Sequence, residues 1–329
     1  MSERIVKKTK LTSKKVQSEK AIAARDMSKL SPSLKALINA PFARPGQAAA
    51  PRHIRDIYAR IAHEARERKY GERPWVTLSA AATFTLNSPS SLLILHDLAS
   101  SSSSSTNLSP LRTAELIREI GLKCISFNGI PRTINCLGAF KAGLDPSLAS
   151  QLTTTPSRHL TPDNIASVTE HGRDLWASIY TPFDEKLEAK LADSHPDLPV
   201  HILGCHYGPL LADPPARNAQ RRQGSGLGAV GRNLTSVVAV ACLRAQTGVG
   251  PQVLSHVFGL RKGVEQGLHR EEFVGVEDGE AEAEGVERLA GDEGCEWLLR
   301  SVDAIAEAVG SSYARWDGEG GKGGRESKL

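Results

Sequence analysis

The chain has 329 residues, of which 40% are hydrophobic and 24% charged, so it can bury a sizeable core and is not expected to be disordered throughout. Its formal net charge of +4 is too small to indicate a nucleic-acid-binding protein. No apolar run approaches the ~18–20 residues of a membrane span, and no hydrophobic stretch follows the basic N-terminus, so we expect neither a span nor a secretory signal.

The N-terminal residues 1–27 carry eight Lys or Arg side chains and three acidic ones, which is typical of a solvated basic arm. After this arm, helix signals are frequent and strand signals are scarce. Apolar residues recur every three or four positions over residues 111–127, preceded by Ser109-Pro110, a pair that favours the start of a helix. The same spacing over residues 234–245 predicts a second helix, and Gly250-Pro251 begins a third. Short breaks between these segments predict antiparallel neighbours in a helical bundle.

An internal repeat organises the rest of the chain. Residues 53–61 match residues 171–179 at seven of nine positions, counting similar residues. Each match is followed by an apolar helix, then by a helix with one histidine, His96 or His256, and then by a closing helix. We interpret this as a duplication in which the second half holds an extra segment, roughly residues 181–232. The predicted divisions are residues 28–146 for the first repeat, 147–270 for the second, 271–294 for an acidic insertion, 295–316 for a closing helix and 317–329 for a flexible tail.

Two stretches of biased composition complete the C-terminal part. Residues 270–297 hold eleven acidic and two basic side chains with interspersed glycines, and we interpret them as a mobile insertion rather than a site. The tail is glycine-rich and ends in Ser327-Lys328-Leu329, the tripeptide that the peroxisomal import receptor reads. The sequence therefore predicts a protein of the peroxisomal matrix with that receptor as a partner.

The five cysteines are scattered and contain no C-x-x-C pair, which argues against a disulfide framework, a zinc ribbon or a thioredoxin-type motif. They are Cys124, Cys136, Cys205, Cys242 and Cys295. His201 and His206 are five residues apart, the wrong spacing for two ligands on one helix face. We expect no metal site and no cofactor.

Histidines are the first candidates for catalysis because imidazole exchanges protons near neutral pH. His256 is the favoured general acid or base, and His96 occupies the same place in the first repeat. Both also fit a core histidine bonded to a carbonyl group. Tyr207 follows Cys205 and His206 between two glycines, and these three residues fit either a pocket wall or an ordinary turn.

Asn128 and Arg132 stand at the end of the first closing helix. An amide and a guanidinium there could hold a carboxylate substrate. The alternative is a helix cap, because Asn and Gly often end helices in the left-handed conformation.

Several of these segments together resemble the carboxymuconolactone decarboxylase / AhpD-like superfamily, and with the terminal Ser-Lys-Leu its fungal peroxisomal members. The segments are residues 115–122, 127–131, 173–176, 207–208, 234–243 and 254–260. The resemblance implies an all-α bundle with two related repeats, a homo-oligomer, and an active pocket between helices near a subunit boundary. AhpD-like peroxidases carry C-x-x-C before the histidine, but here Val249 and Gln252 stand seven and four residues before His256.

Without that thiol pair, the sequence argues against a cysteine hydroperoxidase and leaves the decarboxylase branch open. The favoured function is acid/base chemistry on a small carboxylate or lactone-like metabolite, with His256 as proton carrier and Tyr207, Asn128 and Arg132 positioning the substrate. A non-catalytic binding or scaffold protein is the main alternative. A thiol-dependent hydroperoxidase is a minor one, with Cys205 preferred over Cys242 because an apolar face lowers the reactivity of a thiol.

Overall fold

A computed structural model describes residues 30–101, 108–214, 230–276 and 278–310. The predicted all-α class is confirmed, because the described residues form helices and contain no β-strand. The chain divides into two units, Met1–Gly46 with Ala314–Leu329, and Gln47–Tyr313. In the first unit, Ser31 accepts a hydrogen bond from the Leu34 backbone and begins helix α2 (Pro32–Ile38), which is followed by the 3₁₀ turn η1 (Pro41–Ala43).

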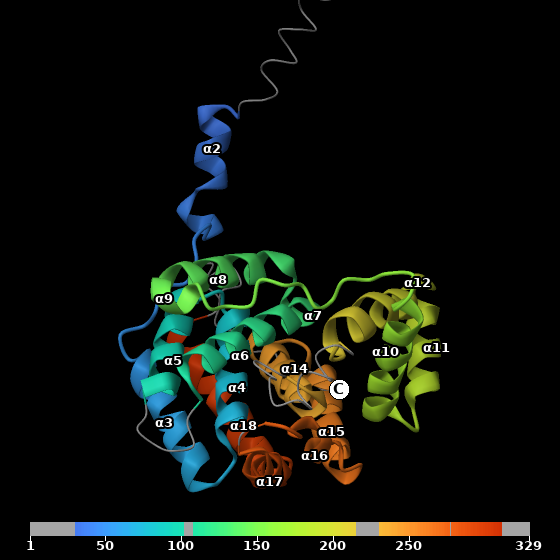
Figure 1. The fold of residues 1–329 in the computed structure, drawn as a ribbon. Helices are drawn as coiled ribbons and strands as arrows, with labels where there is room; N and C mark the ends of the chain where they lie inside the picture. Colours follow the sequence, from blue (N-terminus) through green and yellow to red (C-terminus); the bar gives the residue numbers. More distant parts are fainter. Residues whose placement is uncertain (1–29, 102–107, 215–229, 277, 311–329) are drawn as a thin grey trace, which may run out of the picture. The chain divides into compact units, whose positions relative to one another are not determined.

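The second unit holds all the other described helices (Figure 1). In chain order they are α3 (Ile54–Glu67), α4 (Glu72–Thr85), α5 (Pro89–Ser101), α6 (Pro110–Lys123), α7 (Ile125–Asn128), α8 (Ile130–Gly143), α9 (Pro146–Ala149), α10 (Ile165–Tyr180), α11 (Asp184–Ser194), α12 (Asp197–His201), η2 (Ile202–Leu211), α14 (Arg232–Gln246), α15 (Gly250–Glu265), α16 (Leu268–Glu272), α17 (Gly279–Leu289) and α18 (Asp292–Val309). No helix in the described part of the chain has both the length and the apolar character that crossing a membrane requires.

Helices α4 and α14 form the centre of this unit. They pack against each other, and every residue of α4 is buried. The helices α5, α6 and α18 pack on α4, while α15 and α18 pack on α14. Because these two helices are largely enclosed, their apolar residues are spread around the helix and show little amphipathic pattern.

The predicted helix starts are confirmed. Ser109 accepts a hydrogen bond from the Arg112 backbone at 3.3 Å, and Pro110 takes the first helical position of α6. Helix α15 begins at Gly250 with Pro251 in its first turn. Both starts follow from proline, whose fixed φ suits the first turn and whose missing N–H has no partner to lose there.

A second, smaller core lies between α10 and η2, the latter a π-helix. A Cβ atom at Gly172 would stand 2.5 Å from the backbone nitrogen of Gly208, so only glycine allows α10 and η2 to approach this closely. Figure 1 shows α10, α11 and α12 gathered at one side of the bundle, where α10 also contacts α15. This close contact places the aromatic residues of α10 against Tyr207 on η2.

The fully buried Lys123 attaches the end of η2 to the central bundle. Its ammonium group donates to the Leu211 carbonyl at 2.7 Å and the Thr235 hydroxyl at 2.9 Å, bonds the Val230 carbonyl, and pairs with Asp213 at 3.4 Å. Burial lowers its pKa, and Asp213 opposes that shift. These four oxygen atoms replace the hydrogen bonds with water that the ammonium group loses on burial.

The acidic stretch differs from the expected mobile insertion. Its described residues form parts of α16, α17 and α18, and Ala283, Val286 and Leu289 are buried in the main core. Two of its carboxylates bind helix N-termini: Glu272 accepts from the Asn233 and Leu234 backbone at 2.7 and 3.1 Å. Acidic side chains near the exposed backbone N–H groups and the positive end of a helix stabilise it, which explains why this stretch folds.

Glu282 has the same role at the other central helix. It accepts hydrogen bonds from the backbone nitrogens of Glu72 and Arg73 at 3.0 and 3.2 Å, so it caps α4 as Glu272 caps α14. The sequence predicts that α4 and α14 are equivalent helices of two related repeats. The glutamate cap that both helices share is compatible with this equivalence, which stays a prediction.

Candidate functional site

His256 lies on α15 among side chains from three other elements. It is 7% exposed, and within the described structure its ring nitrogen Nδ1 is buried without a hydrogen-bond partner. The rings of Phe127 on α7 and Tyr180 on α10 stand edge-on to the imidazole, with centroids 5.9 and 6.3 Å away. A buried polar atom without a protein partner is costly in a folded protein, so it indicates stored strain, a bound water or a group kept for a ligand.

An aromatic cluster continues from His256 into the smaller core. Trp176 packs on Tyr180 with ring centroids 4.2 Å apart and on Tyr207 at 5.1 Å, and the two tyrosine hydroxyl groups are 3.2 Å apart. The indole nitrogen of Trp176 is also buried without a partner. Burial raises the pKa of both tyrosines, so they stay protonated and can donate hydrogen bonds. The structure thus links the predicted Tyr207 to His256 through Tyr180.

Arg232 supplies a positive charge beside this cluster. Its guanidinium donates to the Ser178 hydroxyl at 2.6 Å, to the Ser236 hydroxyl at 2.8 Å, and to the carbonyl groups of Ser178 and Gly259 at 3.1 and 2.9 Å. All these partners are neutral, and no carboxylate of the described residues lies within ion-pair distance of Arg232. Burial lowers its pKa to about 10, which still leaves it charged near neutral pH.

The surroundings of His256 shift its pKa strongly. Burial, and then the charge of Arg232, lower the pKa of its imidazole to about 4. The ring is therefore neutral near pH 7 and acts as a hydrogen-bond acceptor or proton acceptor rather than as a ready acid.

A cavity of about 320 Å³ reaches Arg232 from the solvent side. Ser178 and Arg232 line it together with Leu175, Leu211, Gly231, Leu268 and several acidic residues. Those acids are Asp174, Asp213, Glu271 and Glu272, of which Glu272 caps α14 and Asp213 pairs with Lys123. Arg232 thus lines an open cavity and also acts through its charge on His256.

His96 has a different environment. Its Nε2 atom is 2.9 Å from the Pro110 carbonyl oxygen, and its ring lies edge-on to Phe140 at 5.8 Å. Burial lowers its pKa as well. These contacts match the alternative of a core histidine bonded to a carbonyl group, and they place His96 against α6 and α8 rather than in the aromatic cluster. A catalytic role for His96 stays a prediction without geometric support.

The described contacts of Asn128 and Arg132 are with α4 and α14. Asn128 accepts from the Thr85 hydroxyl at 3.1 Å and donates to the sulfur of Cys242 at 3.7 Å, while Arg132 bonds the Thr85 carbonyl oxygen. Gly129 ends α7 with a φ of 78°, as the helix-cap alternative predicted. Their neighbour Phe127 stands edge-on to His256, and a substrate-holding role for Asn128 and Arg132 stays a prediction.

Cys205 and His206 belong to η2, and the alternative of an ordinary turn is wrong for them. A π-helix is rare and is frequently found at functional sites. Cys205 is exposed, whereas His206 is half-buried and bonds the Ser126 hydroxyl at 3.0 Å through Nδ1. Both side chains differ in burial from Tyr207, so η2 contributes Tyr207 to the aromatic cluster and leaves Cys205 at the surface.

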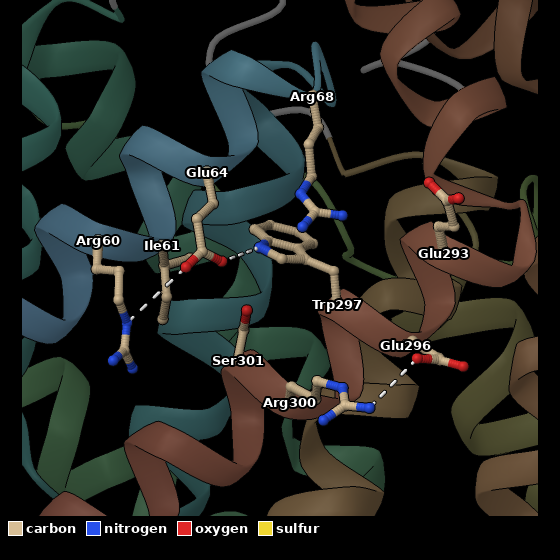
Figure 2. A pocket seen from close by; sticks show the side chains of 9 residues that line it. All are labelled: Arg60, Ile61, Glu64, Arg68, Glu293, Glu296, Trp297, Arg300 and Ser301. Atoms are coloured by element: carbon tan, nitrogen blue, oxygen red, sulfur yellow. Dashed lines mark hydrogen bonds and ion pairs between the residues drawn. The ribbon is translucent and has the colours of Figure 1, made fainter.

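A second large cavity, of about 390 Å³, lies between α3 and α18 (Figure 2). Its arginines and glutamates balance each other: Arg300 pairs with Glu296 at 3.4 Å, and Arg60 lies 4.0 Å from Glu64. Glu64 also accepts from the Trp297 indole at 2.8 Å. Side chains that are already paired have little charge left for a ligand, so this cavity is a weaker candidate.

Sequence reasoning missed Arg232, Tyr180 and Trp176 as members of the site. Trp176 belongs to a segment that supported the resemblance, but nothing near Arg232 distinguished it from a surface arginine. The described residues hold no group of three or more His, Cys, Asp or Glu side chains that could bind a metal ion. The predicted targeting residues Ser327, Lys328 and Leu329 lie outside the described residues. Comparisons of the chain with protein-family models, with curated proteins and with solved structures found no match.

Proposed function

We propose that the His256 cluster binds a small carboxylated metabolite and that the neutral imidazole accepts a proton from it. The observation that carries this proposal is the juxtaposition of a buried, unpartnered His256 nitrogen with a buried guanidinium that has only neutral partners. The Glu272 carboxylate acts on the charge of Arg232 only from beyond ion-pair distance, and a bound carboxylate would add a direct ion pair.

The charge of a bound carboxylate would also change the pKa of His256. Its pKa of about 4 reflects burial and the repulsion of Arg232. A substrate anion offsets that repulsion and adds attraction for a proton, so the pKa of His256 rises toward neutral pH when the site is filled. The imidazole then becomes a competent base in the complex, which is the state in which catalysis needs it. The hydroxyl groups of Tyr180 and Tyr207 orient the substrate through hydrogen bonds.

The wider assignment is a proposal too. We infer a carboxymuconolactone decarboxylase / AhpD-like bundle with two related repeats, assembled as a homo-oligomer. Its support is the helix order, the two buried central helices with their glutamate caps, and the histidine helix that follows each. Peroxisomal import through Ser327-Lys328-Leu329 stays a prediction, and a fluorescent fusion tested with and without these three residues would decide it.

The first experiment measures binding by saturation-transfer NMR, with short-chain mono- and dicarboxylates and the neutral amide of each. We expect saturation transfer to carboxylates and not to their amides, and Arg232→Met should abolish it. The exposed Arg55, which pairs with Asp97 on α5, offers the matched control Arg55→Met. Equal binding of acids and amides would overturn the proposal.

Turnover separates the enzyme from a non-catalytic binding protein. Proton NMR of each bound carboxylate over time should show product formation that is lost in His256→Gln and kept in His63→Gln, an exposed histidine on α3. If carboxylates bind and no product forms in any protein, the binding or scaffold alternative is correct.

A further inference from the structure

Two cysteines from different halves of the chain meet in the core. The Sγ atoms of Cys124, at the end of α6, and Cys242, on α14, are 3.5 Å apart, although 118 positions separate the residues in sequence. We propose that this pair is a modification site: a hydroperoxide oxidises it to an intramolecular disulfide that joins the predicted first repeat to the second.

The geometry favours this pair over the other cysteines. Bonded sulfurs are about 2.05 Å apart, so these two need to approach by roughly 1.5 Å, which side-chain rotation and a slight helix shift can supply. Cys136 instead contacts the Asn87 side chain, and Cys295 contacts the Leu289 and Ala290 carbonyl groups. Cys205 is exposed.

The oxidation balances with one hydroperoxide. The thiolate of one cysteine attacks the terminal oxygen of ROOH, the O–O bond breaks, and ROH leaves together with a sulfenic acid. The second thiol attacks the sulfenic sulfur, the S–S bond forms, and water leaves. Two thiols have then lost two electrons and two protons, and the hydroperoxide has become an alcohol and water.

Burial sets the rate of this reaction. Cys124 and Cys242 are both fully buried, and burial raises the pKa of Cys124 well above its usual range. The Cys124 thiolate is therefore scarce at neutral pH, and oxidation that begins at Cys124 should be slow and should accelerate as pH rises. The side chain of Asn128, which donates to the Cys242 sulfur at 3.7 Å, is half-buried.

The disulfide would connect the end of α6 to α14. Helix α7 follows Cys124 directly and carries Phe127, whose ring stands against His256. The disulfide would therefore also restrain the position of Phe127 in the His256 cluster. The pair lies next to the proposed carboxylate site but does not depend on it, so either proposal can fail without the other.

The experiment uses full-length protein with Cys205→Ser, which removes the exposed thiol. After treatment with hydrogen peroxide over a range of pH and unfolding without reductant, we expect two of the remaining four thiols to be lost. Trypsin cleaves after Lys123, Arg132, Arg232 and Arg244, so peptides 124–132 and 233–244 each hold one of the two cysteines. Mass spectrometry should find them linked and should find them separate after reduction.

Three variants make the outcome decisive. Cys136→Ser should leave the linked peptide pair in place, and Cys124→Ala and Cys242→Ala should each abolish it. The oxidised protein should also have a higher Tm than the reduced one, since a cross-link across 118 positions restricts the unfolded chain strongly. Four intact thiols after a treatment that oxidises Cys205 in the wild-type protein, or a cross-link between other cysteines, would overturn the proposal.

Discussion

His96 and His256 occupy matching places, each on the helix that follows one of the two central helices, yet their environments differ. The imidazole of His96 bonds a carbonyl oxygen at 2.9 Å, while His256 keeps a buried ring nitrogen without a partner beside a buried guanidinium. A satisfied imidazole stabilises the fold, and an unsatisfied one destabilises it unless a ligand completes it. We therefore propose that His96 is structural and His256 functional, a distinction that sequence position alone does not make.

The largest expected effect concerns the structural histidine. His96→Ala removes the bond to the Pro110 carbonyl oxygen and leaves a cavity beside Phe140, so we expect the free energy of unfolding to fall by about 3 kcal/mol. Urea denaturation followed by circular dichroism measures this change.

Carboxylate binding by the folded His96→Ala protein should equal that of the wild type. If the variant kept its stability and lost binding, the comparison between the two histidines would be reversed, and His96 would be the functional one.

The pH dependence of stability isolates His256. Its pKa is about 4 in the folded protein and near 6.5 in an unfolded chain, so the unfolded state binds more protons between these values. The contribution of His256 is therefore fully present above pH 6.5 and is lost as pH falls, by roughly 3 kcal/mol at pH 4.

This contribution is measured as the difference between wild type and His256→Leu. Glu272 and Glu282 shift in the other direction, to a pKa of about 7, because burial disfavours their charged form. They destabilise the fold as pH rises from 4.5 to 7, but they are present in both proteins and cancel. A difference that stays constant from pH 7 to pH 4 would show that the imidazole is not buried as described.

Much of the fold could be predicted because its signals are local. Ser109-Pro110 and Gly250-Pro251 begin helices for reasons confined to a few residues, and periodic apolar residues identify the core. The site could be predicted only in part. The sequence predicted His256 as a proton carrier and Tyr207 as a positioning residue, whereas Arg232 acquires its place in the candidate site from Ser178 and Gly259, on helices distant in sequence. Partners of this kind depend on packing, which no spacing pattern records.

The acidic stretch, residues 270–297, is a second case in which the sequence alone did not show the partners of a side chain. Its composition indicated mobility, because many like charges near glycines repel each other in an isolated segment. In the folded chain, Glu272 and Glu282 meet the N-termini of α14 and α4. Composition describes a segment alone and misses partners that other parts of the chain provide.

Glu272 and Glu282 should contribute equally to stability, because each caps the N-terminus of one of the two central helices. Glu272→Ala and Glu282→Ala each leave two backbone N–H groups of a central helix without their acceptors, and we expect each to lower the free energy of unfolding by about 2 kcal/mol. Thermal denaturation is the measurement, with the exposed neighbours Glu271→Ala and Glu280→Ala as controls. A clear loss in only one of the two variants would contradict the proposed likeness of the two central helices.

The smallest expected change in stability belongs to His256, the histidine that we propose to be functional. His256→Leu replaces an imidazole that has an unpartnered buried nitrogen by an apolar side chain of similar size, so stability near neutral pH should stay within about 1 kcal/mol of the wild type or rise. Turnover of a bound carboxylate should disappear in the same protein, because no other described group of the aromatic cluster is a neutral base. A fold that tolerates this change while the reaction stops would show that His256 is retained for chemistry. A loss of several kcal/mol would instead make it a second structural histidine, and the contrast with His96 would vanish.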